Sequence, residues 1–326
     1  MAKVMIVDNV APEAAQILEQ EGHEVRTEAG KLDTPDLIAA CAGCQGLIVR
    51  SATKVTAEFM AARPELSVVG RAGVGVDNID IDAASEHGIL VVNAPTGNTI
   101  AAAEHTLALM FALARHIPQA MDTLCQGRWE RKRFLGVELA GKTLGVLGLG
   151  RVGSAVAQRA EALGMRVLAY DPYISPEQVA VPNIKLTSFN DVVRQADFIT
   201  LHLPLTDETR GIISKQALAQ MKPGVRLINA ARGALVDEAA LADALKSGQV
   251  AGAALDVFAE EPCTNSPLLG LDNVVMTPHL GASTKEAQVH VAVEVAKQVA
   301  DALAGRRPKH CLNWERALQQ GAAVGM

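Results

Sequence analysis

Polar residues suited to proton transfer and anion binding recur in the second half of this 326-residue chain, each just after a short apolar run. They are His202, Arg232, Asp256 with Glu260 and Glu261, and His279. Oxidation of a secondary alcohol needs a base for the hydroxyl proton, and histidine has a suitable pKa. A carboxylate on its other ring nitrogen would fix the tautomer, and an arginine would hold a substrate carboxylate bidentately. Arg232, Glu261 and His279 could fill these roles.

Spacing alone does not assign these roles. His202 competes with His279 for the place of the base. Taken singly, Arg232 is equally well explained as a surface residue beside a helix, and Glu261 as a solvated acid. Three further histidines lie in helical surroundings and are expected to be structural: His87, His105 and His116.

A glycine-rich segment, Gly148-Leu149-Gly150-Arg151-Val152-Gly153, follows a strand-like run and opens an alanine-rich helix. The first glycine permits the tight turn, the second lets backbone approach a pyrophosphate, and the third allows close helix packing. Asp171 ends the next strand, 18 residues after Gly153, where a carboxylate would accept hydrogen bonds from the adenine ribose and repel a 2′-phosphate. Because no arginine follows in Pro172-Tyr173-Ile174, the pattern predicts NAD rather than NADP.

Short β-like runs alternate with helical stretches, which is typical of parallel sheets with crossover helices. The expected strands form two series: 4–7, 47–49, 68–69 and 89–92, then 143–147, 167–170, 198–201, 227–229, 251–255 and 274–276. Between the series we expect a helix over 99–115, followed by a charged stretch, 127–133, that we interpret as a domain connection. A helix over 284–303 could pack on either unit, and a short tail follows Leu318. The fold class is α/β, with two domains favoured by the length.

Composition excludes several classes of protein. A net charge of -6 and a pI near 5.8 disfavour a general nucleic-acid or anionic-membrane binder, because such partners call for excess positive charge. No apolar run is long enough for a transmembrane helix and no signal peptide is visible, so we expect a cytoplasmic protein. The five scattered cysteines suggest free thiols, and the isolated Cys41-x-x-Cys44 pair does not predict a metal site.

The chain resembles the D-isomer-specific 2-hydroxyacid dehydrogenase family over about its first 310 residues. The matching stretches are 49–54 (Val-Arg-Ser-Ala-Thr-Lys), 71–78 (Arg-Ala-Gly-Val-Gly-Val-Asp-Asn), 129–132, 148–153, 229–237, 252–262 and 278–284. The resemblance implies two parallel-sheet domains, Rossmann-like and flavodoxin-like, with the cofactor domain inserted into the substrate domain. The implied boundaries are 1–95 for the first part of the substrate domain, 96–284 for the NAD-binding domain, and 285–326 for a returning helix and the tail.

The resemblance also implies site residues by position. The family's catalytic residues fall on Arg232, Glu261, which directly precedes proline, and His279. Cofactor contacts are implied at Gly148, Gly150, Arg151, Val152, Gly153, Asp171, Ala230, Asp256 and Gly281, with Asp256 near the nicotinamide amide. Substrate contacts are implied at Arg50, Arg71, Gly73, Val74, Gly75, Asn98, Arg131, Arg232 and His279. His202 then becomes a cofactor-side or structural residue.

Basic residues bear on the substrate. Arg50, Arg71 and the cluster 131–133 could neutralise the phosphate of a phosphorylated 2-hydroxy acid, whereas glyoxylate or hydroxypyruvate needs no such charge. The alternative for 131–133 is a solvated charged face. A rival of another class is an NAD-sensing protein without catalytic activity on the same fold.

The chain departs from its family in two places, and the family also implies a partner subunit. Close relatives often have threonine where this chain has Val74, so one polar contact is lost. Longer members carry C-terminal regulatory domains, which are not expected in a chain that stops at Met326. The counterpart of 127–133 crosses to a neighbouring subunit, which implies a homodimer or homotetramer.

Overall fold

The computed structural model describes residues 1–179 and 184–321, and these form two compact units. The first unit comprises Met1–Asn98 and Ala282–Met326, and the second comprises Thr99–Gly281. The second is therefore inserted into the first. Each unit is built around one parallel sheet, which confirms the predicted α/β class.

The sheet of the first unit has the strand order β2-β1-β3-β4-β5, and all its pairs are parallel. Its strands are β1 (Lys3–Ile6), β2 (Glu24–Thr27), β3 (Gly46–Val49), β4 (Val68–Arg71) and β5 (Leu90–Asn93). Its helices are α1 (Glu13–Gln20), α2 (Thr34–Ala40), α3 (Ala57–Ala61), α4 (Ile81–Glu86), α11 (Lys285–Leu303) and α12 (Trp314–Gln319).

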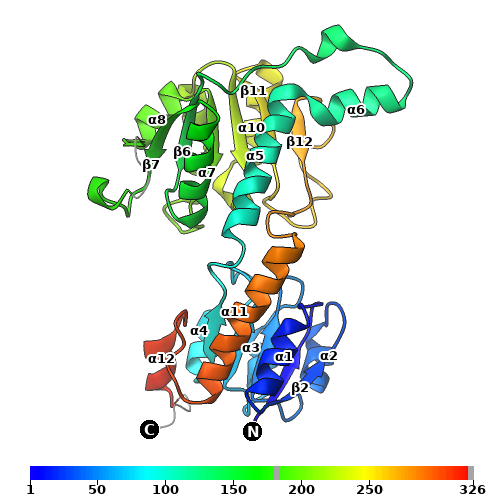
Figure 1. The fold of residues 1–326 in the computed structure, drawn as a ribbon, viewed down its shortest axis with the longest axis vertical. Coiled ribbons are helices and arrows are strands. Elements are labelled where there is room, and N and C mark those ends of the chain that lie inside the picture. Colours follow the sequence, from blue (N-terminus) through cyan, green and yellow to red (C-terminus); the bar gives the residue numbers. More distant parts are fainter. Residues whose placement is uncertain (180–183, 322–326) are drawn as a thin grey trace. The chain divides into compact units, whose positions relative to one another are not determined.

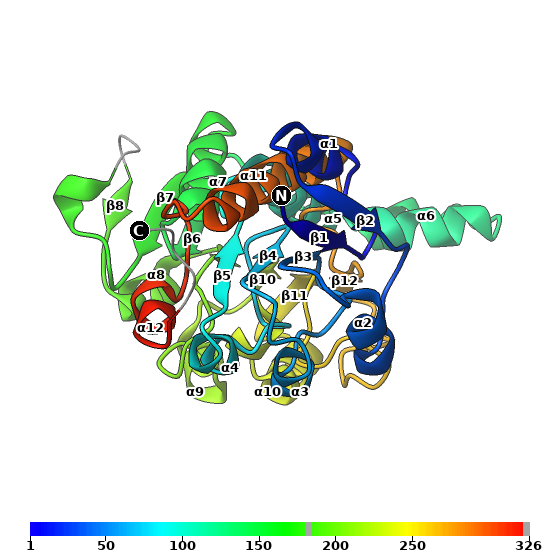
Figure 2. The same cartoon turned by 90° about the horizontal axis from the view of Figure 1, so that it is seen from below.

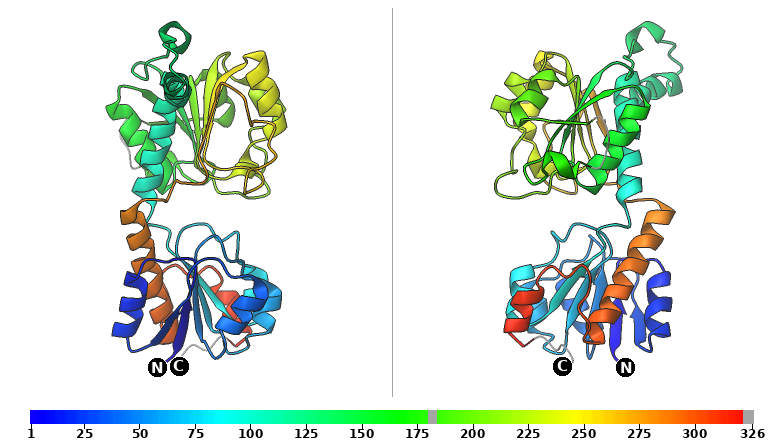
Figure 3. Two further views of the ribbon diagram at one scale, coloured as in Figure 1. Left: turned by 90° about the vertical axis from the view of Figure 1, so that its right-hand side faces the viewer. Right: turned by 60° about the vertical axis from the view of Figure 1, so that its left-hand side comes forward.

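Successive side chains along these strands point to opposite faces of the sheet, so each face has its own hydrophobic core. Val4 and Ile6 face α1 and α11, whereas Met5 and Val7 face α2, α3 and α4. Figure 3 shows α1 and α11 together on one face and the other helices opposite. Residues four apart on α11, namely Val291, Val295 and Val299, form one apolar stripe and are buried. The helix predicted over 284–303, which is α11, therefore packs on the first unit.

The sheet of the second unit has the order β12-β11-β10-β9-β6-β7-β8, again with parallel pairs. Its strands are β6 (Thr143–Leu147), β7 (Arg166–Tyr170), β8 (Lys185–Leu186), β9 (Phe198–Leu201), β10 (Val225–Asn229), β11 (Val250–Leu255) and β12 (Val274–Met276). Its α-helices are α5 (Thr99–Arg115), α6 (Ile117–Cys125), α7 (Arg151–Ala162), α8 (Phe189–Gln195), α9 (Lys215–Gln220) and α10 (Glu238–Ser247). Short 3-10 turns are η1 (Arg131–Phe134), η2 (Pro176–Gln178) and η3 (Gly233–Leu235).

Two layers of helix cover this second sheet. Figure 1 and Figure 3 show α5 and α7 on one face, with α8 and α10 on the other. Leu144 and Val146 pack towards α5 and α7, whereas Leu147 and Leu201 belong to the core on the opposite face. The sheet is thus buried on both sides, as its continuous Val, Ile and Leu runs predict.

Two strands and one connection differ from the sequence-based prediction. The prediction missed β2 and β8, because both are short edge strands with charged residues and lack a buried apolar run. Interpreting 127–133 as a domain connection was wrong: this stretch and α5 lie inside the second unit. The chain changes unit at Asn98–Thr99 and again after Gly281. The tail predicted after Leu318 lies outside the described residues from 322 onward.

Among the residues that the structure describes, no helix is both long and apolar enough to cross a membrane.

Candidate active site

The topology of the second sheet places the candidate polar residues just beyond the carboxyl ends of its strands. From β6 the chain moves outward through β7 and β8, then returns to β9 on the other side of β6. In parallel sheets, ligands bind beyond the carboxyl ends of the strands at such a reversal. The glycine-rich segment follows β6 and His202 follows β9, so both lie at the reversal. The carboxyl ends of other strands in this sheet are followed by Asp171, Arg232, Asp256 and His279.

The three glycines of the fingerprint differ in their surroundings. Gly148 has φ +99°, and a Cβ there would lie 2.6 Å from the backbone of His202. At Gly153 a Cβ would lie 1.9 Å from the carbonyl oxygen of Gly148, so α7 approaches β6 as closely as a glycine allows. A Cβ at Gly150 would meet nothing within 4 Å, so this face of the turn is open. The backbone at the start of α7, including Arg151 and Val152, fits a pyrophosphate there.

Asp171 lies directly after β7, next to the glycine turn. Its Oδ2 accepts a hydrogen bond from the Leu149 amide at 2.8 Å, and its Oδ1 accepts one from Tyr173, also at 2.8 Å. These two bonds fix the carboxylate, and the remaining lone pairs of its oxygens can accept ribose hydroxyls. The residues present thus fit the adenosine half of a dinucleotide.

Asp256, the residue after β11, is buried with 1% of its surface exposed and accepts bonds from four groups. The ring Nε2 of His105 lies 3.1 Å from Oδ1, to which the Thr277 hydroxyl and the Leu280 amide also donate. Oδ2 accepts the Gly281 amide at 2.8 Å. Burial alone would raise the pKa of Asp256, but these donors hold it below its usual range. The carboxylate is therefore ionised and fixed.

This carboxylate shapes the loop that carries His279. The backbone carbonyl of Asp256 accepts the His279 amide at 2.9 Å, and its side chain holds the next two amides. His279 has φ +56°, a left-handed conformation that costs a residue with a Cβ about 1–2 kcal/mol. Hydrogen bonds to one buried acid offset that cost, so the loop has one defined shape.

Glu261 and His279 form a close pair beyond the carboxyl ends of the strands, and both side chains are partly exposed. The Nδ1 atom of His279 lies 2.7 Å from Oε2 of Glu261, whose Oε1 accepts the Phe258 amide at 3.2 Å. Partial burial would raise the pKa of Glu261, but the bond and charge of His279 keep it below its usual value. An ionised carboxylate accepts a proton-bearing Nδ1, so Nε2 of a neutral His279 is the free base.

Arg232 follows β10 in a turn shaped by Asn229. The Asn229 amide group donates to the carbonyl of Arg232 at 2.9 Å, and its oxygen accepts the Ala231 amide at 3.0 Å. A Cβ at Gly233 would lie 1.9 Å from the backbone of Phe258, so this turn lies directly against the segment that leads to Glu261. Arg232 Nη1 donates to the Ala231 carbonyl at 2.7 Å.

The remaining histidines differ in role. His202 bonds through Nε2 with the Thr200 hydroxyl at 3.0 Å, and burial lowers its pKa to about 4. It supports the turn at Gly148 and is poorly suited to accept a proton. His105, which we expected to be structural, contacts Asp256 directly. Its position on the buried stripe of α5, between Ala101 and Leu109, was the available signal.

In the first unit, the order β2-β1-β3-β4-β5 has its reversal between β1 and β3. Asp8 follows β1 and Arg50 follows β3, so both lie there. Asp8 accepts the amides of Arg50 and Thr53 at 2.9 and 3.0 Å, and the Thr53 hydroxyl at 2.6 Å. From the other side, Asn78 donates to the carbonyls of Arg50 and Thr53 at 2.8 and 2.7 Å. The loop 50–53 is thus held on both sides.

The other predicted substrate residues of this unit follow β4 and β5. Arg71 lies over the glycine turn, since a Cβ at Gly73 would lie 1.5 Å from its Nη1. Val74 is 38% exposed, and its carbonyl accepts a bond from the buried Asn93 side chain at 2.7 Å. Two further predicted substrate residues are Gly75, which lies in the same turn, and Asn98, which directly precedes α5.

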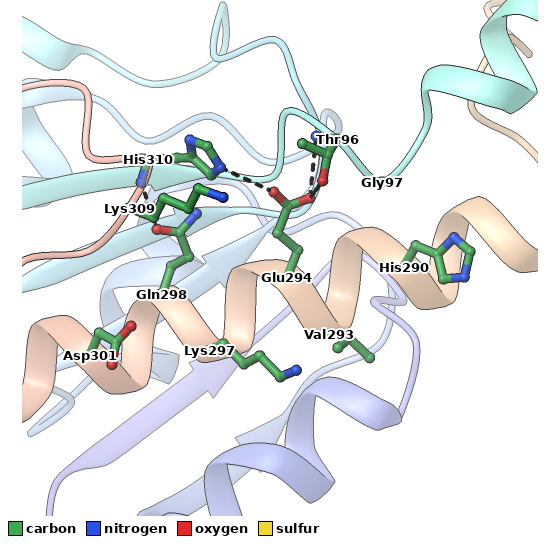
Figure 4. Close-up of a pocket in the computed structure, with 10 residues that line it drawn as sticks. All are labelled: Thr96, Gly97, His290, Val293, Glu294, Lys297, Gln298, Asp301, Lys309 and His310. Atoms are coloured by element: carbon green, nitrogen blue, oxygen red, sulfur yellow. Dashed lines mark hydrogen bonds and ion pairs between the residues drawn. The ribbon is translucent and has the colours of Figure 1, made fainter. Parts of the chain in front are cut away.

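A cavity of about 520 Å³ lies elsewhere in the first unit, beside α11 (Figure 4). None of the predicted site residues lines it. Glu294 accepts the amide and hydroxyl of Thr96 at 3.3 and 2.9 Å and lies 3.6 Å from His310. These groups fasten the segment after β5 to α11, and we assign the cavity no catalytic part.

Arg131 lies in η1, on the loop that follows α6. Figure 1 and Figure 2 show this helix and loop extending away from the seven-stranded sheet. Ile117, Met121 and Leu124 are 52, 66 and 56% exposed and share one face of α6, and Trp129 is 77% exposed. Such an apolar face is typical of an interaction surface.

The fold and the edge residues together define a dinucleotide-binding protein with a histidine–carboxylate pair. Residues 107–281 match the family described as "D-isomer specific 2-hydroxyacid dehydrogenase, NAD binding domain". D-3-phosphoglycerate dehydrogenase of Mycobacterium tuberculosis is 55% identical over 305 residues, which cover 93% of this chain and 57% of that enzyme.

Solved structures agree with this match. The TT0316 protein of Thermus thermophilus has a TM-score of 0.87 at 36% identity, covering 95% of this chain and 99% of that one. A glyoxylate reductase from Paecilomyes thermophila has a TM-score of 0.86 at 29% identity, covering 96 and 99%. The chain belongs to the D-isomer specific 2-hydroxyacid dehydrogenase family. It spans 57% of the length of the M. tuberculosis enzyme.

Asp171 predicts a preference for NADH over NADPH. A carboxylate facing a 2′-phosphate costs about 1.4 kcal/mol or more, so we expect NADH to bind at least about tenfold more tightly. Asp171→Asn keeps an acceptor for the Leu149 amide but removes the negative charge. It should therefore reduce the difference in affinity between NADH and NADPH. Fluorescence titration with both cofactors measures it, with Asp243→Ala on α10 as the control. Equal affinities in the unaltered protein would refute the assignment.

Proposed function

We propose that this protein oxidises D-3-phosphoglycerate to 3-phosphohydroxypyruvate with NAD⁺, the reaction that opens serine biosynthesis. The observation that carries the proposal is the Glu261–His279 pair, 2.7 Å apart, in which His279 lies on a loop fixed by a buried acid. Its supports are the family membership and the 55% identity to an enzyme of that name.

The residues would divide the chemistry as follows. NAD⁺, when bound, would supply the hydride acceptor for carbon 2 of the substrate. His279 takes the hydroxyl proton on Nε2, and the negative charge of Glu261 stabilises the imidazolium that forms. Arg232 binds the substrate carboxylate and polarises the new carbonyl. In the reverse direction His279 returns the proton.

The substrate phosphate needs cationic donors, because the protein as a whole is negatively charged. We assign Arg50 to it, since its loop is braced at the reversal of the first sheet by Asp8 and Asn78. Arg71 would assist from the neighbouring turn, with Gly73, Val74, Gly75 and Asn98 forming the surrounding backbone. Arg131 would come from the partner subunit of a homodimer.

Absorbance at 340 nm with NADH tests the function. We expect turnover of 3-phosphohydroxypyruvate with a higher kcat/KM than glyoxylate or hydroxypyruvate. The similarity to a glyoxylate reductase makes the unphosphorylated acids the second candidate, and a preference for them would replace the substrate assignment. Cofactor binding without turnover of any 2-oxo acid would instead indicate a non-catalytic NAD sensor.

Replacing His279 by alanine should lower kcat by roughly 10²- to 10⁴-fold, the usual contribution of general acid–base catalysis, and leave NADH affinity almost unchanged. Glu261→Gln should cost less and change the pH–rate profile, because the imidazolium loses its charged partner. Stopped-flow rates and cofactor titrations separate these effects. Near-normal turnover of His279→Ala would show that another group is the base.

Arg50→Ala should weaken use of the phosphorylated acid by roughly 10- to 150-fold, the worth of a hydrogen bond to a charged group. The loss should appear in KM, and hydroxypyruvate should be nearly unaffected. Arg26→Ala, on the exposed edge strand of the same unit, is the matched control. An equal loss on both substrates would mean that Arg50 holds the carboxylate or the fold.

We also propose a homodimer, joined through α6 and the loop 127–135. Replacing Met121 by glutamate places a charge in the apolar face of α6 and should shift the protein towards monomer. Sedimentation should give about twice the 34.3 kDa of one chain for the unaltered protein. A 34.3 kDa species at micromolar concentration would contradict this, and a tetramer would require a second interface.

A further inference from the structure

His105 is the one donor to Asp256 that does not come from the 277–281 loop among the residues described. It lies on α5, and its Nε2 lies 3.1 Å from both Asp256 Oδ1 and Thr277 Oγ1. The loop's own donors to that side chain are the Thr277 hydroxyl and the amides of Leu280 and Gly281. His105 therefore ties the acid to a helix of the scaffold.

Hydrogen-bond chemistry fixes the tautomer of this histidine. Asp256 is an ionised acceptor, and the Thr277 hydroxyl gives its own proton to the same carboxylate oxygen. Both neighbours of His105 can thus only accept, so Nε2 must carry a hydrogen and share it between them. A side chain without a donor at this point would leave the carboxylate of Asp256 hydrogen-bonded only to the loop that it holds.

We infer that His105 is a positioning residue for catalysis: through Asp256 it sets the place of the loop that carries His279. The inference rests on the proposed function, because His279 is the base only there. α5 packs along β10, β11 and β12, so it gives the acid a rigid reference. His105 touches none of the reacting groups in this account, and its effect reaches them only through Asp256.

Three replacements of His105 separate a hydrogen bond from mere packing. Glutamine places an N–H near the position of Nε2, asparagine places one nearer Nδ1, and leucine has none. We expect His105→Leu and His105→Asn to lower kcat about tenfold, with KM for the 2-oxo acid changed less than about twofold. His105→Gln should restore most of the rate. His87→Leu, at the exposed end of α4, is the control and should leave kcat unchanged.

Thr277→Val supplies a second route to the same contact. It removes the hydroxyl that shares the His105 proton, so its effect and that of His105→Leu should be less than additive in the double variant. Full additivity, or equal rates in the leucine and glutamine variants, would overturn the inference. Equal thermal unfolding midpoints across the set would exclude a general loss of structure.

A readout without turnover separates this inference from the proposed function. In ¹H–¹⁵N spectra, the amide signals of Leu280 and Gly281 should move in His105→Leu and return in His105→Gln. If the unaltered protein turns over no 2-oxo acid, the proposed function fails and these signals alone decide whether His105 holds the loop. Unmoved signals in His105→Leu would overturn the inference whatever the activity.

Discussion

The arrangement of the candidate site at the carboxyl ends of the second sheet depends on the buried carboxylate of Asp256. Burying a charge is costly unless each of its oxygens finds donors, and here the donors come from α5 and from the loop after β12. The same bonds hold His279 in a left-handed conformation that it would not otherwise favour. Because the backbone of His279 is held in place, its Nδ1 meets Glu261, and its Nε2 is the nitrogen that the proposed function assigns as the base. The hydrogen bonds of one buried acid thus define the conformation of a strained loop.

In the first unit, too, a buried aspartate holds a loop where the strand order reverses, between β1 and β3. Asp8, 6% exposed and at φ +63°, accepts two amides and a hydroxyl from the loop that begins at Arg50. In both units a buried aspartate that follows a strand shapes the backbone of the loop bearing a candidate functional side chain. The cost of each buried acid is offset by bonds that also remove alternative loop conformations.

Sequence reasoning reached the strands and helices with long apolar runs, because hydrophobic periodicity reports burial. It missed β2 and β8, which form by pairing at a sheet edge rather than by burial. It named Asp171, Arg232, Glu261 and His279, whose positions after strands are visible in one dimension. It could not see that His105 reaches Asp256 across 151 positions, or that Asp8 and Asn78 brace the Arg50 loop, because those contacts exist only after the sheet has formed. The roles of these residues in binding and catalysis remain predictions.

The most direct test of this account is amide hydrogen exchange at Leu280 and Gly281 in the unliganded protein. Because both amides donate to a buried carboxylate, we predict exchange at least about 10³-fold slower than in an exposed loop, even though Leu280 itself is 40% exposed. In Asp256→Asn the protection should be lost at these two sites and retained along β11. Exchange at the rate of an unstructured loop in the unaltered protein would show that Asp256 does not hold the His279 loop, and would contradict the account.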